Sequence, residues 1–261
     1  MSEDVKEGYV NVARLDGIAT IEFYHPQSNS LPGSLLTTLA KTIKEEGENV
    51  ETKVIILRSG GEKIFCSGAS FDELAAIKTE AAGLEFFSGF ARVLNAMRKA
   101  PKFIVARIHG KCIGGGVGLA AAADYAIAVE GADIKLSELA VGIGPFVVGP
   151  AVERKLGLSA FSQLTIDASM WRSSDWARRK GLYAELHPDL AGMDASIIRL
   201  AETLSQSNPE AMGEIKKILW KATDNWDALL PERAAISGKL ILSEYSKNFI
   251  ASFKEKKGNN L

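Results

Sequence analysis

The chain has 261 residues, of which 46% are hydrophobic and 24% are charged, and its formal net charge is −1. This composition supports a normal hydrophobic core and excludes intrinsic disorder, and the near-neutral charge gives no basis for binding nucleic acid or an acidic membrane. The two cysteines and three histidines show no metal-ligand spacing, so we expect no metal and two free thiols in a reducing cytoplasm.

The first two-thirds of the chain alternate between strand and helix patterns. Apolar residues on both sides of Asp16-Gly17 predict a β-hairpin, because both turn residues tolerate positive φ. The alternation that follows predicts an α/β fold with parallel strand pairing. The expected elements are a helix capped by Ser34 and ending near Gly47, a strand at 54–57, a helix from Ser70, a helix ending before Pro101, and strands at 103–108 and 125–129.

From Ala195 onward the chain reads as helix. Asn208-Pro209-Glu210 predicts a helix start, with a capping side chain, a proline at the first helical position and an acid in the first turn. We therefore divide the chain into a body, residues 1–194, and a helical region, residues 195–261, which serves either assembly or packing onto its own body. No apolar run reaches the roughly 18 residues of a membrane span, and the acidic N-terminus lacks a secretory signal, so we expect a cytoplasmic protein.

Two small-residue loops are the first candidates for a site. The glycine run at residues 113–119 (IGGGVGL) follows a predicted strand and enters an alanine-rich helix pattern. Glycines there let a ligand approach the main chain, and free N–H groups at a helix start attract negative charge. Residues 65–71 (FCSGASF) form a similar loop. Two such loops that each offer one N–H group to the same oxygen would form an oxyanion hole.

Glu138 is the third candidate, because it lies among aliphatic residues. In a pocket its pKa would rise toward neutrality and suit general acid–base catalysis, whereas at the end of a strand it would be solvated. Other interpretations stay open at this point. The glycines are compatible with a structural turn or, through Gly116-x-Gly118-x-x-Ala121 with Glu138 about 20 residues on, with a nucleotide-binding fold. Cys66 is either a small core residue or a nucleophile without an evident histidine.

Together and in this order, these segments resemble the enoyl-CoA hydratase/isomerase, or crotonase, family. Residues 65–71 and 109–119 are similar to its two CoA-loop motifs, residues 137–145 (SELAVGIGP) to its catalytic segment, and residues 176–182 (WARRKGL) to the turn before its helical tail. The resemblance covers residues 10–257 and is nearest to bacterial 3-methylglutaconyl-CoA hydratase-like members. It implies a ClpP-like spiral of ββα units with a C-terminal helical trimerisation region, and homotrimers that often stack as hexamers.

The resemblance also implies an acyl-CoA thioester substrate, with coenzyme A as part of the substrate and no separate cofactor. The implied catalytic groups are the N–H groups of Ala69 and Gly115, which hold the thioester oxygen, and the carboxylate of Glu138. Acyl-pocket walls are expected from residues 71–90 and 145–148. The implied substrate-binding residues are Ser67, Gly68, Gly114, Gly118, Pro145, Phe253 and Lys256, of which the last two would reach coenzyme A from a neighbouring subunit.

The sequence departs from the family pattern at the second acid. Hydratases of this family usually carry two glutamates, and the second maps onto Gly118, which has no side chain. Asp72 also replaces a lysine that is common after the first oxyanion residue. One carboxylate suffices to move a double bond, which favours an isomerase. Bacterial relatives with the same GGGxGL pattern favour hydration. We therefore expect a hydratase-type enzyme, with a double-bond isomerase and a weakly active acyl-CoA-binding homologue as alternatives.

Overall fold

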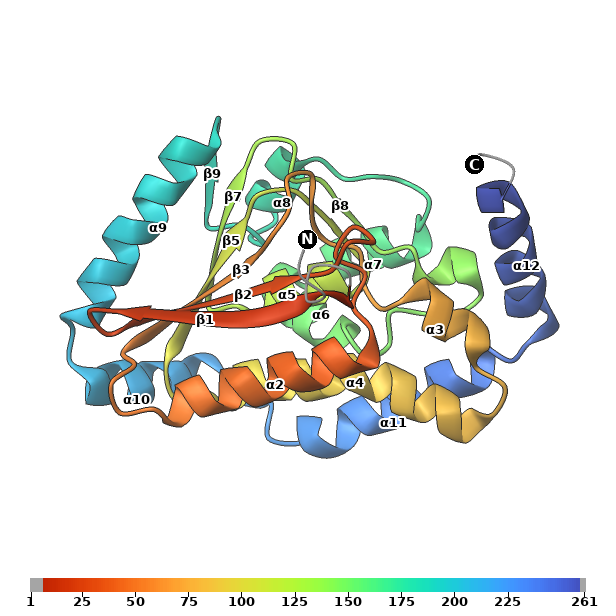
Figure 1. Cartoon of the computed structure of the whole chain (residues 1–261), viewed down its shortest axis with the longest axis horizontal. Coiled ribbons are helices and arrows are strands. Elements are labelled where there is room, and N and C mark those ends of the chain that lie inside the picture. The colour runs from red at the N-terminus through yellow and green to blue at the C-terminus, as the bar shows by residue number, and fades with distance from the viewer. Residues whose placement is uncertain (1–6, 259–261) are drawn as a thin grey trace.

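The computed structural model describes the backbone of residues 7–258 and the side chains of residues 7–254. Within it the strands form a six-stranded sheet of order β1-β2-β3-β5-β7-β9 and a three-stranded sheet of order β4-β6-β8 (Figure 1). The strands are β1 (Tyr9–Leu15), β2 (Ile18–Tyr24), β3 (Val54–Ser59), β4 (Ile64–Cys66), β5 (Phe103–Ile108), β6 (Lys111–Ile113), β7 (Tyr125–Val129), β8 (Ile134–Lys135) and β9 (Glu185–His187).

The predicted hairpin and the predicted strands are present. Strands β1 and β2 pair antiparallel around Asp16 (φ 49°) and Gly17 (φ 80°), the left-handed conformations that this tight turn requires. The other pairs in both sheets are parallel. Strands β5 and β7 have the predicted bounds, and β3 extends the predicted strand by two residues to Ser59. The predicted α/β class with parallel pairing is therefore confirmed.

After the β1–β2 hairpin, which lies wholly in the large sheet, each of three strand pairs contributes its first strand to the large sheet and its second strand to the small sheet before the chain enters a helix. The pairs β3–β4, β5–β6 and β7–β8 follow this rule. This is the expected ββα repeat. The strands of the small sheet have two or three residues each, which is too short for an alternating pattern, and sequence reasoning missed them.

The helices include most of those expected from the sequence. Ser70 caps α3, where its side chain accepts a hydrogen bond from the N–H of Glu73, and Asn208 caps α10. The helices are α2 (Gly33–Glu48), α3 (Phe71–Ala76), α4 (Glu80–Lys99), α5 (Gly115–Ala122), the 3₁₀ helix η1 (Glu138–Val141), α6 (Gly149–Leu156), α7 (Leu158–Ile166), α8 (Ser174–Arg179), α9 (Leu190–Ser205), α10 (Pro209–Leu219), α11 (Trp226–Leu240) and α12 (Glu244–Gly258).

The prediction that Ser34 caps the helix ending near Gly47 is wrong. Helix α2 begins two residues earlier than predicted, at Gly33, and its cap residue is Pro32, which offers no side-chain hydrogen bond. A long-range contact replaces the local cap, because Glu73 Oε2 accepts a hydrogen bond of 2.9 Å from the N–H of Gly33. A helix start needs an acceptor for its free N–H groups, and here the neighbouring helix α3 supplies it.

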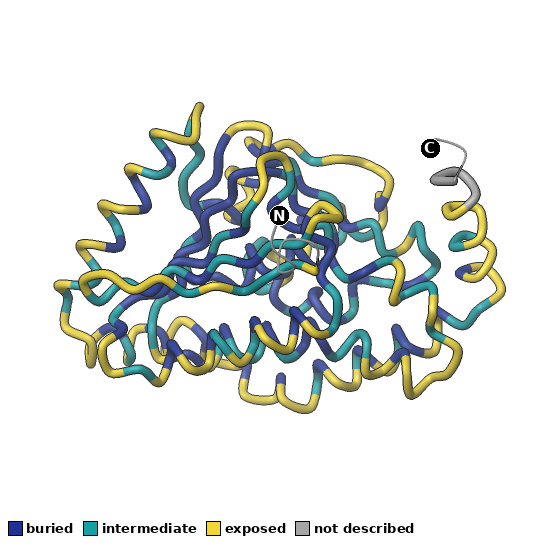
Figure 2. The backbone as a smooth tube through the Cα atoms, viewed as in Figure 1, coloured by how far each residue is buried: buried dark blue, intermediate teal, exposed yellow. Residues whose placement is uncertain are grey.

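Helices cover both faces of the large sheet (Figure 1). Helix α2 lies against β1 and β2 on one face, α4 packs on α2, and α11 packs on α4, where a Cβ at Gly83 would stand 2.6 Å from the Cα of Gly238. Helix α9 packs on the opposite face and begins at Leu190, five residues before the predicted helical region. Figure 2 shows that the inner strands of the large sheet are mostly buried, whereas the edge strand β1 and the outer faces of the helices are largely exposed. None of the helices within the described residues is long and apolar enough to span a lipid bilayer.

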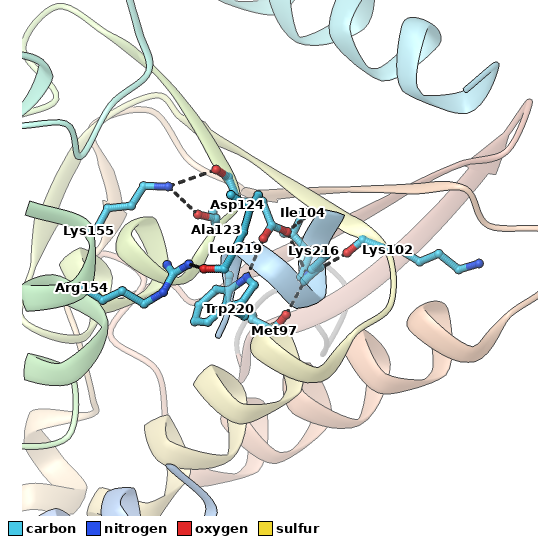
Figure 3. A network of polar contacts seen from close by, with 10 residues as sticks. All are labelled: Met97, Lys102, Ile104, Ala123, Asp124, Arg154, Lys155, Lys216, Leu219 and Trp220. Carbon is cyan, nitrogen blue, oxygen red and sulfur yellow. Dashed lines mark hydrogen bonds and ion pairs between the residues drawn. The ribbon is translucent and has the colours of Figure 1, made fainter. Parts of the chain in front are cut away.

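A buried polar network attaches α10 to the body (Figure 3). Asp124, between α5 and β7, accepts hydrogen bonds of 2.8 Å from the N–H of Ile104 and from Trp220 Nε1. Its Oδ2 lies 2.9 Å from Lys216 Nζ, and both side chains are less than a tenth exposed. Lys216 also donates to the carbonyl oxygens of Met97 and Lys102, so the buried ammonium is fully coordinated. One carboxylate thus links α10 to β5.

Candidate active site

The three segments singled out in the sequence meet at one cavity of about 160 Å³. Residues 67–69 of the first loop, Gly114 and Gly115 of the glycine run, and Glu138 line it. Ser67, Gly68, Gly114 and Pro145, for which substrate contacts are predicted, all line this cavity. The rest of the wall is mainly aromatic and aliphatic: Phe71, Leu74, Phe86, Phe87, Phe90, Val141, Ile143, Pro145, Phe146, Val147 and Val148.

The N–H group of Ala69 is free because of how its loop pairs with the chain. Leu31 forms a parallel bridge with Ala69, in which the N–H of Leu31 donates to Gly68 O (2.7 Å) and the N–H of Ser70 donates to Leu31 O (2.9 Å). Successive N–H groups of an extended chain point to opposite sides, so the N–H of Ala69 faces away from Leu31. It has no acceptor among the described residues, and Ala69 lines the cavity.

The N–H group of Gly115 is free for a different reason. Gly115 is the first residue of α5, and the first N–H groups of a helix have no partner within it. No described residue accepts from it. The two loops are adjacent, since a Cβ built on Gly68 would stand 3.4 Å from the nitrogen of Gly115. Two main-chain donors therefore border one cavity, and the dipole of α5 favours negative charge beside the second.

The glycines of the run are required by close packing. A Cβ at Gly115 would stand 2.2 Å from Phe90 Cζ, and one at Gly116 would stand 2.3 Å from the carbonyl oxygen of Cys66. Gly114 has φ 53°, and its Cβ would stand 3.0 Å from Glu138 Oε1. The run is therefore the point where three other segments approach its main chain. At Gly116 the approaching group is the protein's own main chain at Cys66, which argues against the nucleotide-binding interpretation, in which a pyrophosphate would approach this turn.

Glu138 lies in the cavity and not at a solvated strand end. It opens η1, and its Oε2 is buried without a hydrogen-bond partner among the described residues. Burial raises the pKa of Glu138 from its ordinary value of 4.5 to about 7. It carries the one ionisable side chain among the described residues that line the cavity. A carboxylate with a near-neutral pKa beside an oxyanion hole suits proton transfer at physiological pH.

Gly118 does not reach the cavity. All residues of α5 are buried, and a Cβ at Gly118 would stand 2.6 Å from Val148 Cγ1. Val148 lines the cavity, so its side chain occupies the place into which a side chain at position 118 would extend. Val148 thus separates Gly118 from the cavity, and the substrate contact expected at Gly118 stays a prediction. Val148, an apolar residue, thus fills the space that the side chain of a second acid at position 118 would occupy.

The coenzyme A contacts expected of Phe253 and Lys256 stay predictions. Phe253 of α12 does not line the cavity but packs on Phe71, which does, with ring centroids 4.5 Å apart. Helix α12 therefore lies beside the cavity wall of its own chain. The side chain of Lys256 lies outside the described residues. Asp72, in place of the family's lysine, accepts a hydrogen bond of 3.1 Å from Gln27 Nε2.

The cysteines are core residues. Cys66 and Cys112 are free and buried, and burial raises the pKa of the Cys66 thiol to about 12. Because the thiolate is the nucleophilic form, a thiol with such a pKa is unreactive at neutral pH. The structure thus favours the interpretation of Cys66 as a small core residue over that of a nucleophile.

Comparison with known proteins agrees with the resemblance. A family profile described as enoyl-CoA hydratase/isomerase matches residues 14–260. Carnitinyl-CoA dehydratase of Salmonella enteritidis is 29% identical over 214 residues, which cover 82% of this chain and 80% of the relative. The "probable enoyl-CoA hydratase" of Bacillus subtilis is 26% identical over 242 residues, which cover 92% and 93%.

Solved structures show the same fold. The crystal structure of enoyl-CoA hydratase from Bacillus halodurans has a TM-score of 0.86 at 22% sequence identity, covering 94% of this chain and 99% of that one. This likeness, together with the ββα repeat, confirms the predicted crotonase-type spiral. Because the family profile spans nearly the whole sequence, the chain belongs to the enoyl-CoA hydratase/isomerase, or crotonase, family.

Proposed function

We propose that this protein is a hydratase-type enzyme that adds water to the double bond of an enoyl-CoA thioester, or removes it in the reverse direction. The observation that carries the proposal is that two free main-chain N–H groups and one buried glutamate with a near-neutral pKa border the same apolar cavity. The names of the relatives, a carnitinyl-CoA dehydratase and an enoyl-CoA hydratase, support this reaction class.

The proposed reaction moves charge onto the thioester oxygen, which accepts hydrogen bonds from the N–H groups of Ala69 and Gly115. Glu138 takes a proton from water as the water oxygen bonds to the β carbon. The electron pair of the double bond moves to form an enolate, and the two N–H groups stabilise its oxygen. The protonated Glu138 then delivers its proton to the α carbon, so the carboxylate is regenerated and one water has been added.

Double-bond isomerisation is the second candidate, and the filled space beside Gly118 favours it. With Val148 in the place of a second acid, Glu138 alone would remove a proton from one carbon of the acyl chain and return it two carbons away. This step needs no activated water, and the same oxyanion hole would stabilise its dienolate. The two reactions therefore share all three catalytic groups and differ in whether water enters.

A panel of thioesters separates the candidates. We expect the protein to hydrate crotonyl-CoA or a branched 2-enoyl-CoA, seen as loss of the ultraviolet absorbance of the conjugated thioester and as ¹⁸O from labelled water in the product. Conversion of 3-enoyl-CoA to 2-enoyl-CoA without ¹⁸O would assign the isomerase reaction instead. Tight binding of all thioesters without turnover would assign an acyl-CoA-binding homologue.

The proposed oxyanion donor of the first loop can be removed by one substitution. Proline has no N–H group, so Ala69→Pro should lower kcat by about 10²- to 10³-fold, the loss seen when one oxyanion donor is removed. Ala69→Gly keeps the N–H group and is the matched control, for which we expect near-normal turnover. If both variants fold and lose activity equally, the N–H of Ala69 is not the relevant group.

We also propose that the protein acts in the cytoplasm as a homotrimer or as a hexamer of two stacked trimers. Aliphatic side chains on the outer face of α10 support an assembly surface there, since Ile215, Ile218 and Leu219 are each about half exposed or more. The two buried free thiols are consistent with a reducing compartment. Sedimentation equilibrium would test the assembly, and the mass of a single chain at micromolar concentration would contradict it.

A further inference from the structure

One side of α5 contacts both Glu138 and Val148. Gly114 directly precedes α5, and the N–H of Gly118, four residues on, donates a hydrogen bond of 3.3 Å to the carbonyl oxygen of Gly114. Residues four apart in a helix lie on the same side, about 5–6 Å from one another. A Cβ at Gly114 would stand 3.0 Å from Glu138 Oε1, and one at Gly118 would stand 2.6 Å from Val148 Cγ1. Val148 therefore lies about one helical turn from the Glu138 carboxyl group.

Val148 closes the space between Gly118 and the reaction cavity. The three atoms nearest to a Cβ at Gly118, at 2.6, 2.8 and 3.8 Å, all belong to Val148. Val148 is 4% exposed and lines the cavity. Its main chain is held at the start of α6, where its carbonyl oxygen accepts a hydrogen bond of 3.1 Å from the N–H of Val152. A valine side chain is short and stiff, so it fills this space in one orientation.

The methyl groups of Val148 keep water from this part of the cavity. A bound water needs about 30 Å³ of space and two to four polar partners, and methyl groups supply neither. Glu138 Oε2 is buried without a hydrogen-bond partner among the described residues, so a water admitted here would find an acceptor at once. Addition of water to a double bond needs such a positioned water, whereas migration of the double bond needs only the carboxylate.

We propose that Val148 is a specificity-determining residue, which limits water addition relative to double-bond migration by keeping water out of the space between Gly118 and Glu138. This inference rests on the proposed function for the oxyanion hole and for Glu138 as the proton carrier. It goes beyond that function because the two candidate reactions share these groups and differ in whether water enters. The balance between them is thereby assigned to one apolar side chain.

The test removes two methyl groups from either of two adjacent valines. Val148→Ala opens the space beside Gly118, and Val147→Ala, in the same cavity wall, is the matched control. The rates measured are ¹⁸O incorporation from labelled water into the product of crotonyl-CoA and conversion of 3-hexenoyl-CoA to 2-hexenoyl-CoA. We expect Val148→Ala to raise the ratio of hydration to migration by about 3- to 10-fold, the effect of about one hydrogen bond to the water. Val147→Ala should leave the ratio unchanged, whatever its effect on each rate.

A second variant covers the case in which Val148→Ala does not fold. Val148→Thr keeps the branched shape and offers a hydroxyl group to water, so it should raise the ratio as well. If the wild type only moves double bonds, Val148→Ala should gain hydration. If the wild type only hydrates, its kcat should rise in Val148→Ala and not in Val147→Ala. Folded Val148 variants that hydrate no better than the Val147→Ala control would overturn the inference.

A further measurement needs no turnover. The infrared carboxyl band of Glu138, identified by its loss in Glu138→Gln, reports the ionisation of this group. Burial raises the pKa of Glu138 to about 7, and a water that enters beside it would stabilise the charged form. The pKa should therefore fall in Val148→Ala and stay unchanged in Val147→Ala. If no thioester is converted, the proposed function fails and this titration still tests Val148, for which an unchanged pKa would overturn the inference.

Discussion

Replacing Glu138 with glutamine is expected to lower kcat by about two to four orders of magnitude, the range for loss of a general acid–base group. Gln has nearly the same shape as Glu and leaves both oxyanion donors in place, so acyl-CoA binding should persist. Single-turnover rates with a 2-enoyl-CoA and calorimetry with the saturated thioester would measure the two effects. Turnover that stays within a factor of two would refute the proposed role of Glu138.

The same variant should also differ from the wild type in how its free energy of unfolding depends on pH. Because the pKa of Glu138 is raised from 4.5 to about 7, the folded protein retains a proton between these values that the unfolded chain has lost. The free energy of unfolding of the wild type should therefore fall relative to that of Glu138→Gln as the pH rises through this window. Urea titrations at several pH values would show this, and parallel curves for the two proteins would contradict the raised pKa.

Activity should follow the ionisation of the same group. Glu138 must be deprotonated to accept a proton, so kcat/KM of the wild type should rise with pH through an inflection near 7. The residual activity of Glu138→Gln should lack this inflection. An inflection that persists in the variant would assign the titration to another group.

Replacing Asp124 with asparagine should destabilise the fold by about 3–5 kcal/mol, the cost of leaving one member of a buried ion pair without its partner. Asn retains an oxygen acceptor but not the charge that faces Lys216 Nζ at 2.9 Å. Burial lowers the pKa of Lys216, and the Asp124 carboxylate opposes this shift. Guanidinium unfolding at one fixed protein concentration would measure the loss.

Two controls distinguish the ion pair from general damage. Lys217→Met removes an exposed lysine that pairs with Glu214 at 2.6 Å, and its effect should be about 0–1 kcal/mol. The double variant Asp124→Asn with Lys216→Met should cost less than the sum of the single variants, because neither charge is then left alone. Additive losses would show that the two side chains do not stabilise one another.

The sequence alone determined the elements whose signals are local. The Asp16-Gly17 turn, the apolar strands β5 and β7, and the caps at Ser70 and Asn208 each depend on residues a few positions apart. The order of the motifs was enough to indicate the family and to single out Ala69, Gly115 and Glu138. The assembly role of residues 195–261 stays a prediction. Local signals succeeded because backbone preference and side-chain periodicity act over one or two turns of chain.

Tertiary structure decided what depends on segments far apart in sequence. Glu73 caps α2 in place of Ser34, and Val148 fills the space beside Gly118. Neither of these contacts leaves a periodic or spacing signal, because each joins residues that only the packing of helices brings together. The raised pKa of Glu138 also depends on the tertiary structure, because burial causes it and burial is a property of the folded chain.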